Sequence, residues 1–347
     1  MLWWGNDFGK RYPKMDEHSK AKVTIREVAK RAGVSVTTVS RVLNGHDLEH
    51  MRPETKARVL EAIEALDYVP VRMAQRLRRQ KTQIIAVLLP DISNPFFSLL
   101  ARGVGSVAFE KGYSTLICDS NHSVEKESRY LKILLAEQVE GIIFIPVGQP
   151  DRESINRLLR RGIDIVVADR SVKGLPSVEA DNKSGSYELT ELLLQKGYRN
   201  IAYIAGPQEV STASDRLAGF IAAMQNADVE PVSVQYGNFT YESGYTLAQD
   251  LFRSTNVDAI MAANDLMAIG AIRAAEEMGL HVPQDIGVTG FDHISLLEFV
   301  QPRLTTVHIP AYRMGEAAMR LFIQRSNGKL SEKKILLETK LITGESC

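Results

Sequence analysis

Charged, amide and aromatic side chains recur just beyond the ends of short apolar segments in the C-terminal three-quarters of the chain. They are Asn94, Phe96, Phe97, Asp169, Arg170, Arg216, Phe239, Asn264 and Asp292. If the apolar segments are parallel strands, their carboxyl ends lie where open α/β sheets bind ligands. Aromatic rings pack against the C–H faces of a sugar, and Asp, Asn and Arg groups form paired hydrogen bonds with its vicinal hydroxyls. The pattern therefore predicts a sugar pocket.

Taken one at a time, these residues have ordinary structural explanations. Asp292 fits the N-cap of a helix, and Phe96 and Phe97 fit a hydrophobic core. Their joint placement after successive strands is the evidence for binding.

The N-terminal quarter has the pattern of three short helices, the last over 53–66. Thr24 and Glu27 have the spacing of a capping box, and Gly33 is placed to end the first helix. Ser35 is placed to cap the second helix. Two short helices joined by a turn that contains glycine predict a helix-turn-helix.

In a helix-turn-helix, the second helix enters the major groove with its first residues at the base edges. Those residues are Val36, Thr37 and Thr38, with Ser40 and Arg41 one turn further on. Arg41 suits guanine because its forked guanidinium matches two acceptors there, whereas Val36 offers only apolar contact. The hydroxyls suited to phosphates are those of Ser35, Thr38 and Ser40. A capped helix without any DNA contact is the alternative.

Residues 71–82 form a short basic segment that is capable of forming a helix. Its cations are Arg72, Arg76, Arg78, Arg79 and Lys81, which suit phosphates. Leu77 stands among them without an obvious core to join. Minor-groove proteins insert such apolar side chains between base steps, so Leu77 is a candidate wedge, with simple packing as the alternative.

From Ile84 onward, strand-like apolar segments alternate with segments of helical period. The strand-like segments begin at residues 84, 114, 141, 163, 200, 232, 259 and 286. Repeated strand–helix–strand units predict parallel sheets covered by helices. They fit one large sheet or two Rossmann-like lobes with a cleft, and we prefer the lobes. The expected domains are a disordered extension 1–20, an all-α headpiece 21–69, a hinge helix 70–82 and an α/β body 83–347.

Composition excludes several classes of protein. Of the 347 residues, 44% are hydrophobic and 24% are charged, as in ordinary globular proteins. Two cysteines, Cys118 and Cys347, supply neither a disulfide scaffold nor a CxxC metal pair. No apolar run is long enough to span a bilayer, and the N-terminus lacks the pattern of a signal peptide. We therefore expect a cytoplasmic protein without a metal, cofactor or membrane contact.

The net charge of zero conceals an asymmetry. Residues 1–82 carry 17 Lys and Arg against 10 Asp and Glu, a net of +7, and the rest of the chain carries −7. A basic N-terminal quarter on an acidic body suggests that the smaller part binds a polyanion. A basic tail without a partner is the alternative.

The sequence gives little support to an enzyme. It has no P-loop, no GxGxxG after a strand, and no GxSxG or HExxH motif. Its histidines, among them His122, His281, His293 and His308, are scattered without ligand spacing, and we expect them to be structural.

From Val23 to its end, the chain resembles the LacI/GalR (lactose-repressor) family of bacterial transcription regulators. The segments that carry the resemblance are TIREVAKRAGVSVTTVSRVLNG, a Y-x-P before the arginine-rich hinge, SNPFF, ANDLMAIGA, VPQDIGVTGFD and LTTV. The resemblance implies a homodimer on a near-palindromic operator, with Leu77 wedged into the central minor groove. The candidate DNA contacts are then Thr24, Ser35, Val36, Thr37, Thr38, Ser40, Arg41, Asn44 and Leu77.

The same resemblance implies a body like that of periplasmic sugar-binding proteins, with two lobes and three crossovers. All nine candidate pocket residues fall where a ribose-binding protein contacts its sugar, which suggests ribose or a close pentose. Ile309 departs from the ribose-type pattern, which has Gln there. Thr212 matches a repressor of purine genes, but Val210 replaces its base-contacting Arg, so a purine is disfavoured. Arg52 replaces the usual Ser cap of the third helix.

We therefore expect a transcriptional repressor whose operator affinity is controlled by a small sugar in the interlobe cleft. Induction is the expected sign, since a catabolic sugar normally lifts repression. The alternatives are a regulator that needs a different metabolite as co-repressor, and a sugar-binding protein that acts without DNA.

Overall fold

The computed structural model describes residues 23–44, 51–68, 82–328 and 333–347. The chain divides into two compact units, residues 1–81 and 82–347. The expected extension 1–20 and most of the expected hinge, including Leu77 and its five neighbouring cations, lie outside the described residues.

The first unit contains three helices, α1 (Ile25–Ala32), α2 (Val36–Asn44) and α3 (Pro53–Ala65). Gly33 ends α1 with a left-handed φ of 64°, a conformation that glycine adopts without strain. The helices share a small core that includes Val28, Val39 and Val59. The predicted helix-turn-helix is confirmed, and Arg52, the N-cap of α3, makes no side-chain capping hydrogen bond.

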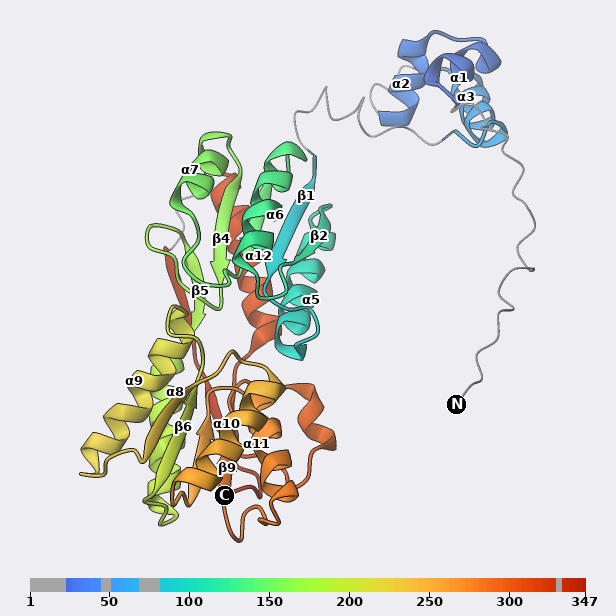
Figure 1. The fold of residues 1–347 in the computed structure, drawn as a ribbon. Helices are drawn as coiled ribbons and strands as arrows, with labels where there is room; N and C mark the ends of the chain where they lie inside the picture. Colours follow the sequence, from blue (N-terminus) through green and yellow to red (C-terminus); the bar gives the residue numbers. More distant parts are fainter. Residues whose placement is uncertain (1–22, 45–50, 69–81, 329–332) are drawn as a thin grey trace, which may run out of the picture. The chain divides into compact units, whose positions relative to one another are not determined.

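The second unit is built from two lobes (Figure 1). The N-lobe has a six-stranded parallel sheet in the order β11-β5-β4-β3-β1-β2. These strands are β1 (Ile84–Leu89), β2 (Ser114–Asp119), β3 (Gly141–Phe144), β4 (Asp164–Ala168), β5 (Ser177–Ala180) and β11 (Lys334–Leu337). Its helices are α5 (Pro95–Glu110), α6 (Val124–Ala136), α7 (Arg152–Arg160) and α12 (Ala311–Ser326).

Alternate residues of β1 point to opposite faces of this sheet. Ile85, Val87 and Leu89 join the core that includes α5 and α12, whereas Ala86 and Leu88 join a second core beneath α6 and α7. The central strands β1, β3 and β4 are buried on both faces of the sheet, which explains why they are almost entirely apolar.

The C-lobe has a four-stranded parallel sheet in the order β7-β6-β8-β9. These strands are β6 (Ile201–Ala205), β7 (Ser233–Tyr236), β8 (Ala259–Ala262) and β9 (Gly287–Thr289). Its helices are α8 (Asn182–Gln195), α9 (Ser211–Asn226), α10 (Tyr241–Ser254) and α11 (Asp265–Glu277). A short 3-10 helix (Ser295–Phe299) follows β9, and an antiparallel pair joins β10 (Thr306–His308) to β12 (Lys340–Ile342).

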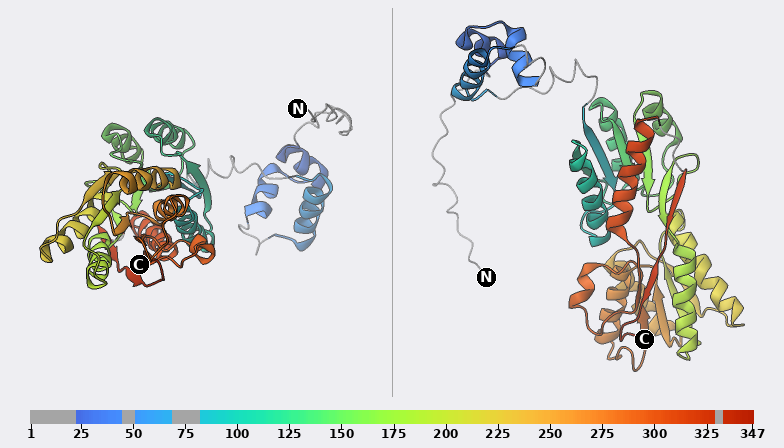
Figure 2. Two further views of the ribbon diagram at one scale, coloured as in Figure 1. Left: turned by 60° about the horizontal axis from the view of Figure 1, so that its bottom comes forward. Right: turned by 180° about the vertical axis from the view of Figure 1, so that it is seen from behind.

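The chain passes between the lobes at β5–α8, at β10–α12 and at β11–β12 (Figures 1 and 2). All eight predicted strands are present, in two separate sheets. Four further strands, β5, β10, β11 and β12, were not predicted, and they have only three or four residues each. Within the described residues, no helix has the length and apolar character needed to cross a bilayer.

Two glycines allow α5 and α12 to pack closely against each other. A Cβ at Gly103 would overlap the backbone carbonyl of Tyr312, and one at Gly315 would overlap that of Leu100. On α5, a Cβ at Gly105 would meet only the Thr115 hydroxyl, at 4.0 Å. Within α5, Gly105 therefore has room for a side chain, whereas Gly103 does not.

Gly103→Ala should lower the free energy of unfolding by about 1–3 kcal/mol, because backbone atoms must move apart to admit a methyl group. Gly105→Ala is the matched control and should stabilise by roughly 0.5–1 kcal/mol, because alanine favours a helix. Urea unfolding of both variants checks this. Equal effects at the two positions would contradict the close approach of α5 and α12.

Candidate functional site

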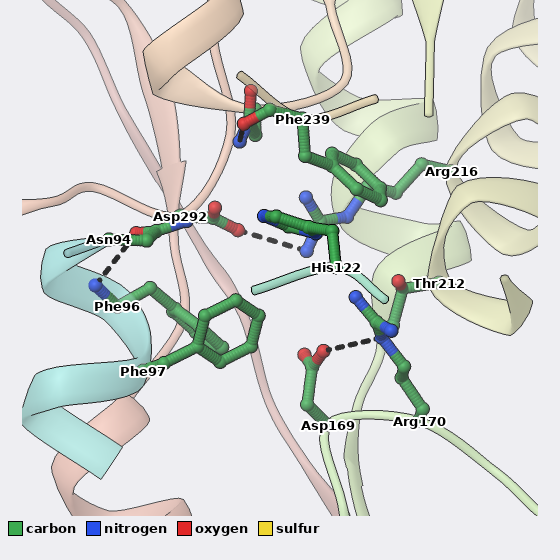
Figure 3. Close-up of a pocket in the computed structure, with 11 residues that line it drawn as sticks. Asn94, Phe96, Phe97, His122, Asp169, Arg170, Thr212, Arg216, Phe239 and Asp292 are labelled. Carbon is green, nitrogen blue, oxygen red and sulfur yellow. Dashed lines mark hydrogen bonds and ion pairs between the residues drawn. The ribbon is translucent and has the colours of Figure 1, made fainter. Parts of the chain in front are cut away.

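All nine predicted pocket residues line one cavity between the lobes, together with His122 and Thr212 (Figure 3). The N-lobe supplies its wall from the start of α5, from the loop after β2 and from the loop after β4. The C-lobe supplies the opposite wall from α9 and from the loops after β7, β8 and β9. The carboxyl ends of strands in both sheets thus face the same space.

Arg216 and Asp292 form an ion pair on the C-lobe side, with 2.9 Å between guanidinium nitrogen and carboxylate oxygen. Both side chains are buried. Arg216 also donates to Asn182 Oδ1 at 2.8 Å and to the Ala263 carbonyl at 2.6 Å. Its guanidinium lies 4.1 Å from the centroid of the Phe291 ring. Neighbouring groups therefore fix Arg216 on several sides.

Asp169 and Arg170 form a second buried acid–base pair on the N-lobe side, 3.7 Å apart. Arg170 also donates to the backbone carbonyl of Pro146. The Oδ1 atom of Asp169 and the Nε atom of Arg170 are buried and have no hydrogen-bond partner among the described residues. Buried polar atoms are normally satisfied, so these two have hydrogen-bonding capacity to offer a ligand.

Two amides and three aromatic rings complete the pocket. Asn94 accepts from Phe96 N at 3.0 Å as the N-cap of α5, and Asn264 accepts from Met267 N at 3.0 Å as the N-cap of α11. Asn264 also donates to the Phe239 carbonyl at 3.0 Å.

The rings of Phe96 and Phe97 meet edge to face at 5.2 Å. Together with Phe239 they belong to the core as well as lining the pocket. Asp292 is not a helix N-cap, since Ile294 holds that position before the 3-10 helix.

Four pocket residues have a left-handed backbone that side chains other than glycine rarely adopt. Their φ angles are 56° for His122, 65° for Asp169, 68° for Phe239 and 106° for Asp292. Such conformations cost about 1–3 kcal/mol and cluster at functional sites. Their convergence on one cavity makes this cavity the candidate functional site of the body.

Burial dominates the electrostatics of the pocket. It raises the pKa of Asp292 to about 7, although Arg216 opposes the shift. It also raises the pKa of Asp169, against the attraction of Arg170, and lowers the pKa of Arg170 itself. Asp265 lies behind the pocket and accepts from the Thr306 hydroxyl at 2.6 Å. Burial and the nearby Asp292 raise the pKa of Asp265 well above its ordinary value.

The raised pKa of Asp292 predicts a pH-dependent stability. Between about pH 4 and 7 the folded protein holds a proton that the unfolded chain has released, so this contribution to stability falls as pH rises. Relative to Asp292→Asn, the wild type should lose up to about 1.4 kcal/mol per pH unit across this window. Urea unfolding from pH 5 to 7.5 measures the difference, with Asp250→Asn at an exposed site as control. Parallel pH profiles for wild type and Asp292→Asn would disprove the shift.

His122 was expected to be structural, yet it lines the pocket. Its backbone N–H donates to the Pro90 carbonyl at 2.9 Å, and its Nε2 lies 3.7 Å from an Asp91 carboxylate oxygen. It follows the end of β2, so the rule that selected the other residues would have found it. Ile309 is buried, and its backbone N–H donates to the Asp292 carbonyl at 3.3 Å, but its side chain does not line the pocket.

A direct hydrogen bond joins the lobes beside the pocket. The backbone N–H of Ser171, after β4, donates to the hydroxyl of Ser211 at the start of α9, at 3.1 Å. The two walls of the cavity are thus in contact at its rim.

In the first unit, α2 presents Val36, Thr37 and Arg41 as exposed side chains. Ser35 accepts from Thr38 N at 3.1 Å, and the two hydroxyls lie 2.9 Å apart, so both take part in capping the helix. Ser40 is half-buried.

Thr24 donates from its backbone N–H and its hydroxyl to Glu27 Oε2, at 2.6 and 2.9 Å, in the predicted capping box. Asn44 is the last residue of α2, and Leu77 lies outside the described residues.

Cys118 and Cys347 are buried free thiols. Across the described ranges, no group of three or more His, Cys, Asp or Glu residues is arranged to hold a metal ion.

A three-helix unit with an exposed second helix and a two-lobed body with a cleft pocket define a DNA-binding regulator fused to a periplasmic-binding-protein-like domain. Residues 24–71 match the family of bacterial regulatory proteins named lacI, and residues 190–347 match the periplasmic binding protein-like domain. The chain is 38% identical to the HTH-type transcriptional regulator RegA of Clostridium saccharobutylicum, over 93% of this chain and 98% of that protein.

A second relative is the ribose operon repressor of Halalkalibacterium halodurans, at 37% identity over 93% of this chain and 96% of that protein. A lac repressor dimer bound to operator and the anti-inducer ONPF matches the fold with a TM-score of 0.83 and 28% identity, over 93% of this chain and 98% of that chain. The chain belongs to the lacI family. It is a DNA-binding transcriptional regulator, as its named relatives are, and not an enzyme.

Proposed function

We propose that this protein is a transcriptional repressor whose affinity for its operator is controlled by a small neutral sugar, ribose or a related pentose. The observation that carries the proposal is the cavity itself. Two buried acid–base pairs and three phenylalanines from two lobes converge on one space. Rings for C–H faces and charged groups for vicinal hydroxyls are what sugar recognition requires. The similarity to a ribose operon repressor supports the same ligand.

The charge balance favours a neutral sugar over a phosphorylated one. Both guanidinium groups of the cavity already face a carboxylate, Arg216 beside Asp292 and Arg170 beside Asp169. A phosphate brings up to two negative charges and needs cations that are not already paired. Val210, where the purine-responsive pattern has Arg, is buried at the start of α9 and offers no polar group to a base.

The proposed mechanism is a linkage between lobe closure and DNA binding. The cavity is partly open to solvent and has a volume of about 20 Å³, which is room for about one water molecule, so we expect the lobes to move apart when a sugar enters. A ligand held by both walls then favours one lobe angle. If the operator favours a different lobe angle, binding of the sugar and binding of the operator weaken each other. This coupling is reciprocal and typically about 1–3 kcal/mol. We propose induction, in which the sugar lowers the affinity for the operator. In co-repression the sugar would raise that affinity.

The DNA-binding parts complete the proposal. The headpiece 21–69 reads the operator through Val36, Thr37 and Arg41, and the hinge 70–82 contacts the minor groove through Leu77. The body 83–347 binds the sugar and joins a second copy of the chain. The edge strand β2 supports the homodimer, because it exposes the apolar side chains of Leu116 and Ile117.

A thermal-shift screen with ribose, other pentoses, hexoses, their phosphates and purines tests the effector. A ligand at 100 times its Kd should add about 2.7 kcal/mol, a rise in Tm of roughly 5–10 °C for a body of this size. Ribose or another pentose should give this shift. A response to purines alone, or to no member of the panel, would overturn the proposed ligand class.

Asp292→Ala should abolish the response to the sugar, because it removes a carboxylate that faces the ligand and leaves Arg216 unpaired. Binding of the operator should persist, since Asp292 lies in the other unit from the headpiece. Operator binding titrated with the active sugar measures both properties. Asp250→Ala, at an exposed aspartate of the same lobe, is the control and should respond like the wild type. A normal sugar response in Asp292→Ala would show that the pocket is misplaced.

Arg41→Ala should weaken binding to the operator by about 1–3 kcal/mol while leaving binding to unrelated DNA nearly unchanged. The reason is that a base-reading arginine contributes to specificity, whereas phosphate contacts contribute to all DNA equally. Fluorescence anisotropy with both DNAs at fixed salt provides the measurement. Arg253→Ala, an exposed arginine of the body, serves as the control. Equal losses on the two DNAs would remove Arg41 from the base-reading role.

A further inference from the structure

Glu127 is a buried carboxylate that does not line the pocket. It lies in the first turn of α6 with only 2% of its surface exposed. Its Oε2 accepts a hydrogen bond of 2.6 Å from the backbone N–H of Val147, which lies in the loop after β3. An acidic residue in the first turn of a helix is favoured by the helix dipole even when it is exposed, and Glu125, two residues earlier, is exposed. Glu127 instead reaches into the protein.

The loop that Glu127 holds is the same loop that holds Arg170. The carbonyl of Pro146 accepts from the Arg170 guanidinium, and the next N–H along the chain, that of Val147, donates to Glu127. A continuous series of contacts therefore runs from α6 through residues 146–147 to the pocket. Arg170 also contacts its neighbour Asp169 and lies 6.0 Å from the centroid of the Phe97 ring, and this loop adds a direct hydrogen bond to its guanidinium.

Electrostatics couples the two ends of this series. Burial raises the pKa of Glu127 to about 7, and the Val147 N–H and the charge of Arg170 oppose that shift. Glu127 in turn favours the charged form of Arg170, whose own pKa burial lowers. An isolated buried charge is costly, and a partner of opposite sign offsets part of that cost. Glu127 thus acts on Arg170 both through the loop and through its charge.

We propose that Glu127 is a positioning residue of the pocket, which clamps the Pro146–Val147 loop and so fixes the Arg170 guanidinium for ligand binding. Its part in binding rests on the proposed function, whereas its hold on the loop and on Arg170 does not. Groups that bind a ligand are effective when the surrounding contacts hold them in place before the ligand arrives. A loosened Arg170 should therefore bind the effector more weakly even though every pocket residue is intact.

The first test needs no ligand and uses the full chain. Amide hydrogen exchange reports on Val147, and the ¹⁵Nε resonance of Arg170, identified by its loss in Arg170→Lys, reports on the guanidinium. Glu127→Ala removes both acceptor and charge, so Val147 should exchange at least about tenfold faster and the Arg170 resonance should shift or broaden. Glu127→Gln keeps an acceptor but not the charge. At pH 8, where Glu127 of the wild type is charged, it should leave Val147 exchange within about threefold of wild type and still shift the Arg170 resonance.

Glu125→Gln is the matched control on the same helix and should change neither signal. If Glu127→Ala leaves the Val147 exchange and the Arg170 resonance as in wild type, the proposal is wrong. Should Glu127→Ala fail to fold, Glu127→Gln decides alone, and an unshifted Arg170 resonance in that variant overturns the proposal.

The second test uses the sugar that raises the Tm of the wild type most in the thermal-shift screen, measured by titration calorimetry. Glu127→Ala should raise its Kd about tenfold, Glu127→Gln should restore most of the affinity, and Glu125→Gln should match the wild type. An unchanged Kd in a Glu127→Ala variant whose Arg170 resonance has shifted would overturn the role in binding. If no ligand binds the wild type, the proposed effector fails, and the exchange and resonance measurements still decide the contact between Glu127 and Arg170.

Discussion

The body depends on the burial of charge between two lobes. Arg216 is almost wholly removed from water, and its partners are a carboxylate after β9, an amide at the start of α8 and a carbonyl after β8. None of these partners can be moved alone without leaving a charged group unsatisfied in a medium of low dielectric constant. The same requirement holds Arg170 between Asp169 and the loop after β3. The sheets therefore position the charged groups as well as the hydrophobic core, because they hold the ends of the strands, and the charged residues that follow them, close together.

The candidate pocket could be predicted from the sequence because one topological rule selects it. Residues such as Asp169 and Asn264 follow apolar strands directly, and parallel strands bring their carboxyl ends together. The helices of the headpiece could be predicted equally well, because Thr24, Glu27 and Gly33 are capping signals that act within a few residues. Both predictions rest on short-range patterns that tertiary packing reinforces.

What the sequence could not give are relations between distant segments. The strands β5 and β11 pair in parallel although about 150 residues separate them, and each is short and contains charged residues. His122 looked like a scattered histidine because its isolation in sequence hides its position at a strand end. Glu127 has no sequence feature that singles it out, because only the fold brings it to Val147. These features depend on tertiary contacts between segments that are distant in sequence, and no local sequence pattern predicts such contacts.

The two walls of the pocket differ in how they connect to the rest of the molecule. Asp292 lies directly against a crossover segment, since its backbone N–H donates to the Val307 carbonyl of β10 and Ile309 N–H donates back to its carbonyl. His122 and Arg170 lie on N-lobe loops that are not themselves crossover segments. Substitutions on the N-lobe loops can therefore change which molecule is recognised while the crossover contacts remain intact. Under the proposed function, substitutions around Asp292 would alter recognition and lobe movement together. A descendant of this protein would then acquire a new ligand most readily through the N-lobe wall, while the C-lobe wall kept the proposed link between ligand binding and lobe movement.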